Sequence, residues 1–370
     1  MKDGANRLDW LDGMRAWAIG LVALIHVGAA MQARGNLTGW LVPLSEFGRY
    51  GVQLFFVISA ATITLTLARR PPVAGWYVRR AFRIAPLYYA AILFYGALMW
   101  LAPAGEPMTV WKWVLGAGAN ALFLHGFVPP AINSIVPGGW SIAVEMTFYA
   151  VAPLLVPLYL SGRVRLWHVL AACVAAVALT EWLASGVMPR TFLFFWPILH
   201  LPVFLIALFF IARERDFLFG NAERRTPLAL CALMLAAGLG GAAAIGPFFE
   251  LSYGAAVPLV GLGFAGLLLL APKELRGLFA NRIAVALGAV AYSVYICHFA
   301  VIRALEAWTG LFERGAGGPA LLGLTLLVLA LTYGAAWCTL RLIERPGIAL
   351  GRKVADLADG RDFKGMGRQW

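Results

Sequence analysis

Residues 14–33 read MRAWAIGLVALIHVGAAMQA, a run of 20 residues in which Arg15 and His26 are the only ionisable side chains. A helix of about 20 apolar residues is long enough to cross a ~30 Å hydrocarbon core. Further apolar blocks of similar length lie near 48–68, 83–102, 141–160, 166–186, 193–212, 227–246, 252–271, 283–304 and 319–342. The sequence therefore predicts an all-α integral membrane protein with about ten transmembrane helices.

The composition supports the same fold class. Of 370 residues, 61% are hydrophobic and 13% are charged, and the mean hydropathy is +0.79. Such a chain has too little polar surface to cover a soluble globule, so its main partner is the lipid bilayer. The first apolar block is long and has no cleavage site of small residues, which favours an uncleaved first span. We expect one transmembrane domain over 1–348 and a polar cytoplasmic tail over 349–370.

The distribution of basic residues predicts the orientation. The N-terminus, the even-numbered loops and the C-terminus hold 23 of the 30 Lys and Arg residues, whereas the odd-numbered loops hold 6. By the positive-inside rule both termini are cytoplasmic. An apolar stretch at 111–128 is shorter, carries polar residues and ends in Pro129-Pro130. We interpret it as a re-entrant or interfacial helix, because an eleventh span would invert every later loop.

Two other features exclude classes of partner. The net charge of +12 follows from membrane topology, so no nucleic-acid partner is predicted. The four cysteines lie inside apolar blocks without CxxC spacing, at positions 173, 231, 297 and 338. No metal site or disulfide framework is therefore expected.

Three ionisable residues fall within the outer half of predicted spans: His26, Glu145 and His298. At 1.5 Å per residue, His26 lies roughly 18 Å above the start of its span, and the other two lie near the outer surface. Their depths are compatible with one pocket. Histidine is suited to take a proton from a hydroxyl that attacks a carbonyl carbon, and a carboxylate can orient the histidine.

Other interpretations of these three residues stay open. An intramembrane histidine also serves simply as a hydrogen-bond partner of a neighbouring helix. Glu145 lies in the first turn of its span, where the helix dipole favours a carboxylate in any case. The three side chains also suit a proton relay, so a proton-coupled transporter or flippase of a glycan or lipid-linked substrate is the alternative function.

A basic cluster lies on the predicted inner side. Arg15 enters the first span, and Arg79, Arg80 and Arg83 lead into the third. Guanidinium groups pair well with phosphates, so the cluster is typical of a clamp for the phosphates of a cytosolic donor. The alternative is that these arginines only anchor the topology and bind lipid headgroups.

Six motifs together resemble the acyltransferase-3 family of bacterial membrane O-acyltransferases, over nearly the whole chain. They are LDGMRA at 11–16 with Arg15 and His26 in Arg-x10-His spacing, FFVIS at 55–59, RAFRIAPLY at 80–88, WSIAVEMTFY at 140–149, AYSVYICHF at 291–299 and IERP at 343–346. The resemblance implies ten transmembrane helices in the cytoplasmic (inner) membrane of a bacterium. It also implies transfer of an acyl group, commonly acetyl, from cytosolic acyl-CoA to a hydroxyl of an extracytoplasmic glycan or related acceptor.

The same resemblance assigns roles to residues. It implies that Arg15 and His26 are needed for activity, that Arg80 and Arg83 form the RxxR element, and that Glu145 is the acid of the Trp-Ser motif. We therefore expect His26, Arg15 and Glu145 to be catalytic, with His26 as general base. Arg79, Arg80 and Arg83 are expected to bind acyl-CoA, most simply acetyl-CoA. The acceptor is expected to contact Trp140, Ser141, Tyr149, Tyr295 and His298.

Overall fold

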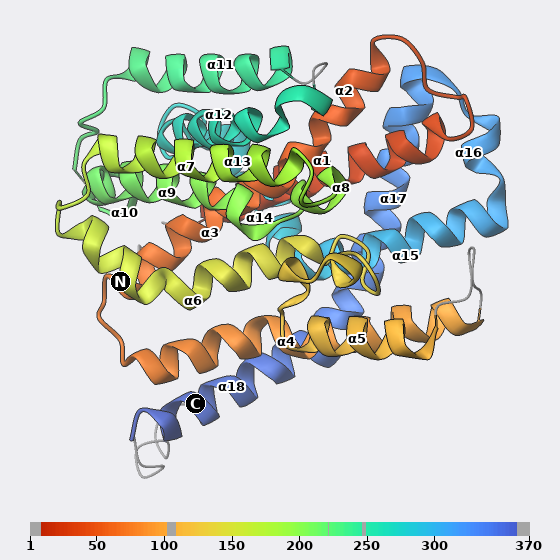
Figure 1. Cartoon of the computed structure of the whole chain (residues 1–370), viewed down its shortest axis with the longest axis horizontal. Coiled ribbons are helices and arrows are strands. Elements are labelled where there is room, and N and C mark those ends of the chain that lie inside the picture. Colours follow the sequence, from red (N-terminus) through yellow and green to blue (C-terminus); the bar gives the residue numbers. More distant parts are fainter. Residues whose placement is uncertain (1–8, 102–108, 221, 246–248, 361–370) are drawn as a thin grey trace.

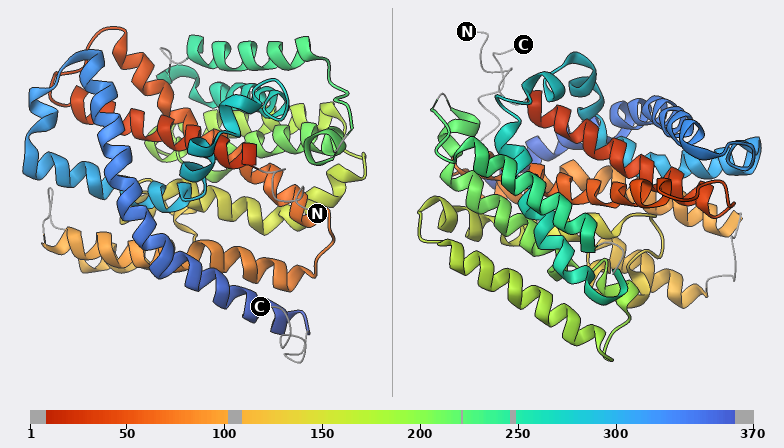
Figure 2. Two further views of the ribbon diagram at one scale, coloured as in Figure 1. Left: turned by 180° about the vertical axis from the view of Figure 1, so that it is seen from behind. Right: turned by 90° about the horizontal axis from the view of Figure 1, so that it is seen from above.

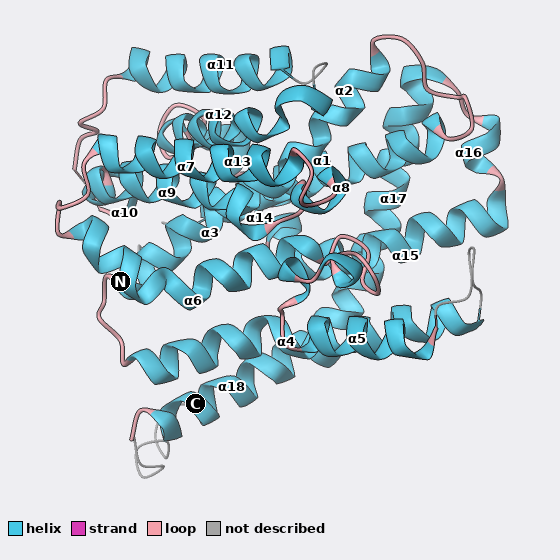
Figure 3. Cartoon of the chain, in the orientation of Figure 1, coloured by secondary structure: helices cyan, strands magenta, loops and turns pink. Residues whose placement is uncertain are grey.

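The computed structural model describes residues 9–101, 109–220, 222–245 and 249–360, and its regular structure over these residues is helical (Figure 3). The longer helices are α1 (Asp9–Gln32), α3 (Gly51–Leu67), α4 (Val73–Leu101), α5 (Val110–Ala121), α6 (Trp140–Leu160), α7 (Leu166–Ala184), α9 (Pro197–Arg213), α11 (Leu228–Ile245), α12 (Phe249–Leu270), α15 (Ala291–Thr309), α17 (Gly317–Thr339) and α18 (Arg345–Ala358). Short helices join them: α2 (Leu41–Phe47), η1 (Gly48–Tyr50), η2 (His125–Phe127), η3 (Pro129–Ala131), α8 (Arg190–Leu193), α10 (Arg215–Phe219), α13 (Arg276–Phe279), α14 (Arg282–Gly288), α16 (Leu311–Arg314) and the π-helical turn η5 (Leu340–Glu344).

The helices confirm an all-α membrane protein. Within the described residues, eight helices are long and apolar enough to cross a bilayer, and a bent pair makes a ninth. The described apolar part of α12, over 254–270, is shorter. Within the described residues, each of the ten predicted spans falls largely on helix. The stretch at 111–128 forms the 12-residue helix α5 and a 3-10 turn, which suits an interfacial or re-entrant segment.

One predicted span is not a continuous helix. The sequence predicts a single span over 283–304, but the chain forms α14 and α15, which meet at 74°. The break follows Gly288, whose α-carbon packs directly on the backbone oxygen of Asp12 in α1. The bend therefore results from close packing against α1, which hydropathy does not report.

The segment predicted as a polar tail is partly helical. Helix α18 extends over 349–358 and packs along α4, with Gly347 and Gly351 against Phe82 and Pro86. Asp359 ends this contact by accepting a hydrogen bond from the backbone N–H of Gly75 at 2.9 Å. Pairing with α4 holds the chain in a helix here, whereas 361–370 lie outside the described residues. The long helices α4 and α18 lie side by side along one edge of the molecule, opposite α11 and α12 (Figures 1 and 2).

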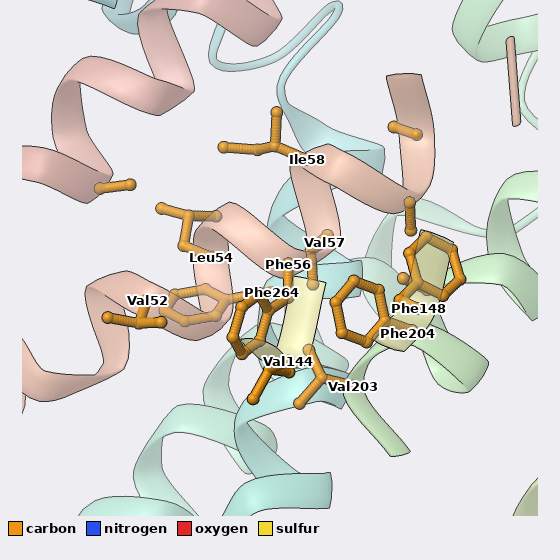
Figure 4. Packing of buried hydrophobic residues seen from close by; sticks show 14 of the residues in the cluster. Val52, Leu54, Phe56, Val57, Ile58, Val144, Phe148, Val203, Phe204 and Phe264 are labelled. Carbon is orange, nitrogen blue, oxygen red and sulfur yellow. The ribbon is translucent and has the colours of Figure 1, made fainter. Parts of the chain in front are cut away.

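The central packing joins α3, α6 and α9. Phe148 of α6 stacks on Phe204 of α9 with 4.1 Å between ring centroids, and Phe56 of α3 stacks on the other side at 5.0 Å. Val144 and Val203 fill the space beside these rings (Figure 4). Lipid is as apolar as these side chains, so close packing rather than exclusion from water stabilises the contact. This core fixes Glu145 and Ser141 of α6 relative to α3.

The start of α1 is held by two glycines. A β-carbon on Gly13 would lie 1.6 Å from the backbone oxygen of Phe279, and one on Gly288 would lie 1.6 Å from that of Asp12. Only glycine permits backbones to approach this closely. The two contacts set the position of Arg15, one turn further along α1.

We predict that Gly13→Ala lowers the stability of the purified protein in detergent by about 1–3 kcal/mol, the usual cost of overpacking. Gly20→Ala is the matched control in the same helix, because nothing lies within 4 Å of its added β-carbon. Its unfolding temperature should match that of the wild type. The unfolding temperatures are measured by tryptophan fluorescence. Equal values for Gly13→Ala and Gly20→Ala would show that the close backbone contact at Gly13 does not stabilise the protein.

Candidate active site

A cavity of about 470 Å³ lies among α1, α3, α4, α6 and α15, and we call it the main cavity. Its volume is within the ~300–1,000 Å³ typical of ligand sites. Seven of the predicted site residues line it: Arg15, Arg80, Arg83, Ser141, Glu145, Tyr149 and Tyr295. Folding thus brings together positions from four of the sequence motifs.

Three guanidinium groups gather on one part of the cavity wall. Arg80 and Arg83 are three residues apart on α4 and therefore share a face of the helix, and Arg15 reaches the cavity from α1. Arg15 is paired with Asp12, and Arg80 donates to the hydroxyl of Thr66 at 3.3 Å. A cavity with this charge is suited to phosphate groups.

Arg79 takes a different direction. It forms an ion pair with Asp359 at 3.3 Å, and that carboxylate is fully buried between α4 and the end of α18. One residue corresponds to about 100° around a helix, so Arg79 and Arg80 face different surroundings. The structure places Arg79 outside the main cavity, where it joins two helices.

Glu145 lies on the cavity wall with both neighbouring hydroxyls turned toward it. Ser59 of α3 donates to the carboxylate at 2.7 Å, and Tyr149, one turn along α6, donates to the same oxygen. The Ser59 and Tyr149 hydroxyls are themselves 3.4 Å apart. The expected contact of Glu145 with His26 is therefore replaced by contacts with α3 and with its own helix.

Ser141 and Tyr295 form a second polar link across the cavity. Ser141 donates to the Tyr295 hydroxyl at 2.7 Å, and Tyr295 donates to the backbone oxygen of Gly138 at 2.8 Å. Gly138 has φ +73°, and a β-carbon there would lie 3.0 Å from both Tyr295 and Phe299. Glycine is required at this turn both for its backbone conformation and for the space.

The two predicted histidines lie together beyond Tyr295. The ring centroids of His26 and His298 are 5.2 Å apart, and Phe299 packs against both rings. Neither histidine lines the main cavity, but the Tyr295 ring, which does, is 5.6 Å from His298. One tyrosine side chain therefore separates the histidine pair from the cavity.

The hydrogen bonding of His298 fixes its tautomer when it is neutral. Its Nδ1 lies 2.6 Å from the backbone oxygen of Tyr295, which can only accept, so Nδ1 carries the proton. Its Nε2 then holds a lone pair, and this buried atom has no hydrogen-bond partner among the described residues. His26, by contrast, is half-buried. The pair thus offers an unprotonated nitrogen inside the bundle.

Trp140, expected to contact the acceptor, does not line the main cavity and packs instead against neighbouring rings behind Ser141. Its ring packs on His200 at 5.0 Å and on Phe195 at 5.1 Å, and Phe56 approaches its edge at 6.4 Å. His200 is buried and donates from Nε2 to the backbone oxygen of Phe194 at 3.0 Å. The membrane span that carries His200 gave no motif signal, so its contact with Trp140 was missed from the sequence.

Other residues at the main cavity were also not predicted. Glu344 in the π-helical turn lines the cavity and accepts a hydrogen bond from Ser293 at 2.8 Å. Asp12 lies on the wall beside Arg15. Both belong to quoted motifs, and Asp12 stands three residues before Arg15, a spacing that favours an ion pair on a helix. No group of metal-ligating side chains is found within the described ranges.

A buried histidine outside the spans holds the turn that leads into α6. His125 donates from Nε2 to the backbone oxygen of Gly139 at 2.9 Å, and Tyr88 donates to Asn120 at 2.6 Å beside it. Burial lowers the pKa of His125 below its ordinary value. Protonation of His125 therefore competes with folding of the turn before Trp140.

Because the pKa of His125 is lower in the folded chain than in the unfolded chain, we predict that the free energy of unfolding falls in mild acid. Above pH ~6.5 His125 is neutral in both folded and unfolded chains, and below it the unfolded chain binds the proton first. The free energy of unfolding should thus decrease as the pH falls from about 7.5 to about 5.5 through this residue. Because Gln keeps a donor and does not titrate, His125→Gln should show a smaller decrease. Identical pH profiles of the unfolding temperature would show that His125 is not responsible.

The arrangement places three arginines and a polar cavity beside the histidine pair inside a bundle of membrane-spanning helices. The acyltransferase-3 sequence model, described as an acyltransferase domain, matches residues 8–341. The chain belongs to the acyltransferase-3 family and is a membrane acyltransferase.

Several bacterial proteins are similar to the chain. The chain is 26% identical to acyltransferase MdmB of Streptomyces mycarofaciens, over 80% of this chain and 79% of that protein. It is 26% identical to the putative membrane-bound transacylase BcsY of Komagataeibacter xylinus, over 93% and 83%. It is 27% identical to nodulation protein 10 of Rhizobium leguminosarum bv. viciae, over 49% and 51%. No solved structure matches the chain significantly.

Proposed function

We propose that this protein transfers an acetyl group from cytosolic acetyl-CoA to a hydroxyl of an extracytoplasmic glycan, with His26 as general base. The observation that carries the proposal is the main cavity, which has three arginines on its wall and the histidine pair one tyrosine away. A donor with phosphates at one end and a thioester at the other fits this order of groups.

The arginines suit the phosphates of CoA. Arg15, Arg80 and Arg83 would pair with them through charge-assisted hydrogen bonds, which are about twice as strong as neutral ones. Along α1, Arg15 and His26 are separated by eleven residues, or about 17 Å. An extended pantetheine arm covers such a distance, so the thioester would reach toward Tyr295.

The proposed step is a direct attack on the thioester. The acceptor hydroxyl oxygen bonds to the carbonyl carbon while His26 takes the hydroxyl proton. The C–S bond then breaks, and the CoA thiolate leaves and takes up that proton. Atoms and charge balance without a metal or a redox partner.

Neighbouring side chains are assigned supporting roles. The lone pair on His298 Nε2 is available to the N–H of His26, which would keep the other nitrogen of His26 as the base. Tyr295 and Ser141 would donate to the acceptor as it arrives, and Trp140 supports this wall. Glu145, which Tyr149 and Ser59 hold in place, would balance the positive charge of the arginines.

The distribution of basic residues supports the orientation that this reaction needs. The RxxR end of α4 would face the cytoplasm, both termini would be cytoplasmic, and the start of α6 would face outward in a bacterial inner membrane. Donor and acceptor would then approach from opposite sides of the bilayer. We assign Arg79 to the α4–α18 contact because it pairs with Asp359.

The direct test measures CoA release from acetyl-CoA by membranes that contain the protein, with an extract of the host's surface glycans as acceptor. We expect His26→Ala to reduce acetyl transfer at least about 100-fold, the usual contribution of a general base. His168→Ala is the control, because His168 is exposed at the start of α7. Its activity should equal that of the wild type.

Two outcomes would count against the proposal. Equal acetyl transfer by His26→Ala and wild type would remove His26 from the mechanism. No release by the wild type, with succinyl-CoA also inert and glycan movement observed without CoA, would support the transporter or flippase instead.

A second prediction concerns the donor. Arg83→Gln should raise the KM for acetyl-CoA about tenfold, since a charge-assisted contact contributes roughly 1.5–3 kcal/mol. The KM for the glycan should change little. Arg276→Gln is the control, because Arg276 is an exposed arginine in the short helix that packs on the start of α1. A KM for acetyl-CoA that is unchanged in Arg83→Gln would show that Arg83 does not bind the donor.

A further inference from the structure

A second cavity of about 530 Å³ lies between α7, α8, α9 and α12, apart from the main cavity. It is lined by Thr180, Glu181, Ala184, Arg190, Thr191, Leu193, Phe194, Phe195, Leu199 and Gly254. We call it the Glu181–Arg190 cavity. An apolar pocket of this size with a few converging polar groups is the usual form of a small-ligand site.

The charged pair at this cavity joins two helices. Glu181 belongs to the last turn of the membrane-spanning helix α7, and Arg190 begins the short helix α8. Its carboxylate lies 3.6 Å from Arg190, and the two side chains are 33% and 49% exposed. The pair is therefore loose and open to a ligand.

The groups around the pair match the chemistry of a sugar ring. A guanidinium donates to hydroxyl oxygens, a carboxylate accepts from hydroxyl groups, and Thr191 can do either. Phe194 and Phe195, both half-buried, offer flat apolar faces for the C–H side of a ring. The same cavity thus provides both kinds of contact that a polyhydroxylated ring requires.

The cavity lies close to the candidate active site. Phe195 lines the Glu181–Arg190 cavity and packs on Trp140 at 5.1 Å, and Trp140 directly precedes Ser141, which lines the main cavity. Helices α6 and α7 are joined only by 161–165, so they run antiparallel and the end of α7 lies at the level where α6 begins. That is the end at which the acceptor is proposed to arrive.

We propose that the Glu181–Arg190 cavity binds a glycosyl unit of the acceptor, remote from the hydroxyl that receives the acyl group. This inference rests on the proposed acetyl transfer to a glycan. Binding at a remote unit would place the acceptor chain along the Trp140 wall and raise its local concentration beside Tyr295.

The test compares Glu181→Gln and Arg190→Gln with the wild type in acetyl transfer to a glycan fraction purified from the host's surface. We expect each variant to raise the KM for this fraction about tenfold, with the KM for acetyl-CoA and the unfolding temperature unchanged. Glu223→Gln is the matched control, because Glu223 forms a pair with Lys273 at the same 3.6 Å distance in an exposed loop. It should behave as the wild type.

The outcomes separate this inference from the proposed function. An unchanged glycan KM in both variants of an active enzyme overturns the inference alone. If the wild type transfers no acetyl group, the proposed function fails. In that case, binding of the same glycan fraction to detergent-solubilised wild type and Glu181→Gln tests whether the cavity binds a glycosyl unit. Weaker binding by the variant supports the inference, and equal binding overturns it.

Discussion

Polar groups inside a bilayer have no water to bind, so they must find partners within the protein, and this constraint joins the helices around the main cavity. Each link is a side-chain hydrogen bond between different elements: Ser59 to Glu145 joins α3 to α6, Ser141 to Tyr295 joins α6 to α15, and Ser293 to Glu344 joins α15 to the π-helical turn. Tyr292 joins α15 to α4 by donating to the backbone oxygen of Ile84. Apart from Ser293, the side chains that make these links also line the cavity.

The irregular backbone occurs where these links meet. The 74° break between α14 and α15 aims Ser293 and Tyr295 into the bundle, and the π-helical turn does the same for Glu344. Departures from regular helix at membrane depth are tolerated where protein or a cavity surrounds them, and π turns are frequent at functional sites. Close packing of Gly288 on α1 stabilises the break, so the start of α1 and the direction of α15 are set together.

The sequence predicts where a residue lies along a helix better than it predicts which neighbouring helix that residue faces. Hydropathy predicted the spans, and helical rise predicted similar depths for His26, Glu145 and His298, of which the two histidines do lie together. Depth does not report position around the bundle, so the sequence could not show that Glu145 faces Ser59. Likewise, the three arginines before the third predicted span looked equivalent, but a single residue step around α4 turns Arg79 toward Asp359. The α18 contact was missed because its composition is polar and its stability comes from α4.

A single turn of α15 connects the parts of the site. The Tyr295 hydroxyl bonds to Ser141 and to the turn before α6, whereas its backbone oxygen takes the Nδ1 proton of His298. The side chain that separates the cavity from the histidines therefore also belongs to the residue that sets the tautomer of one of them. A movement of the Tyr295 ring that admits a ligand would break the two hydrogen bonds of its hydroxyl, to Ser141 and to the turn before α6. The bond that sets the His298 tautomer is made by the backbone of α15, so it persists when the ring moves.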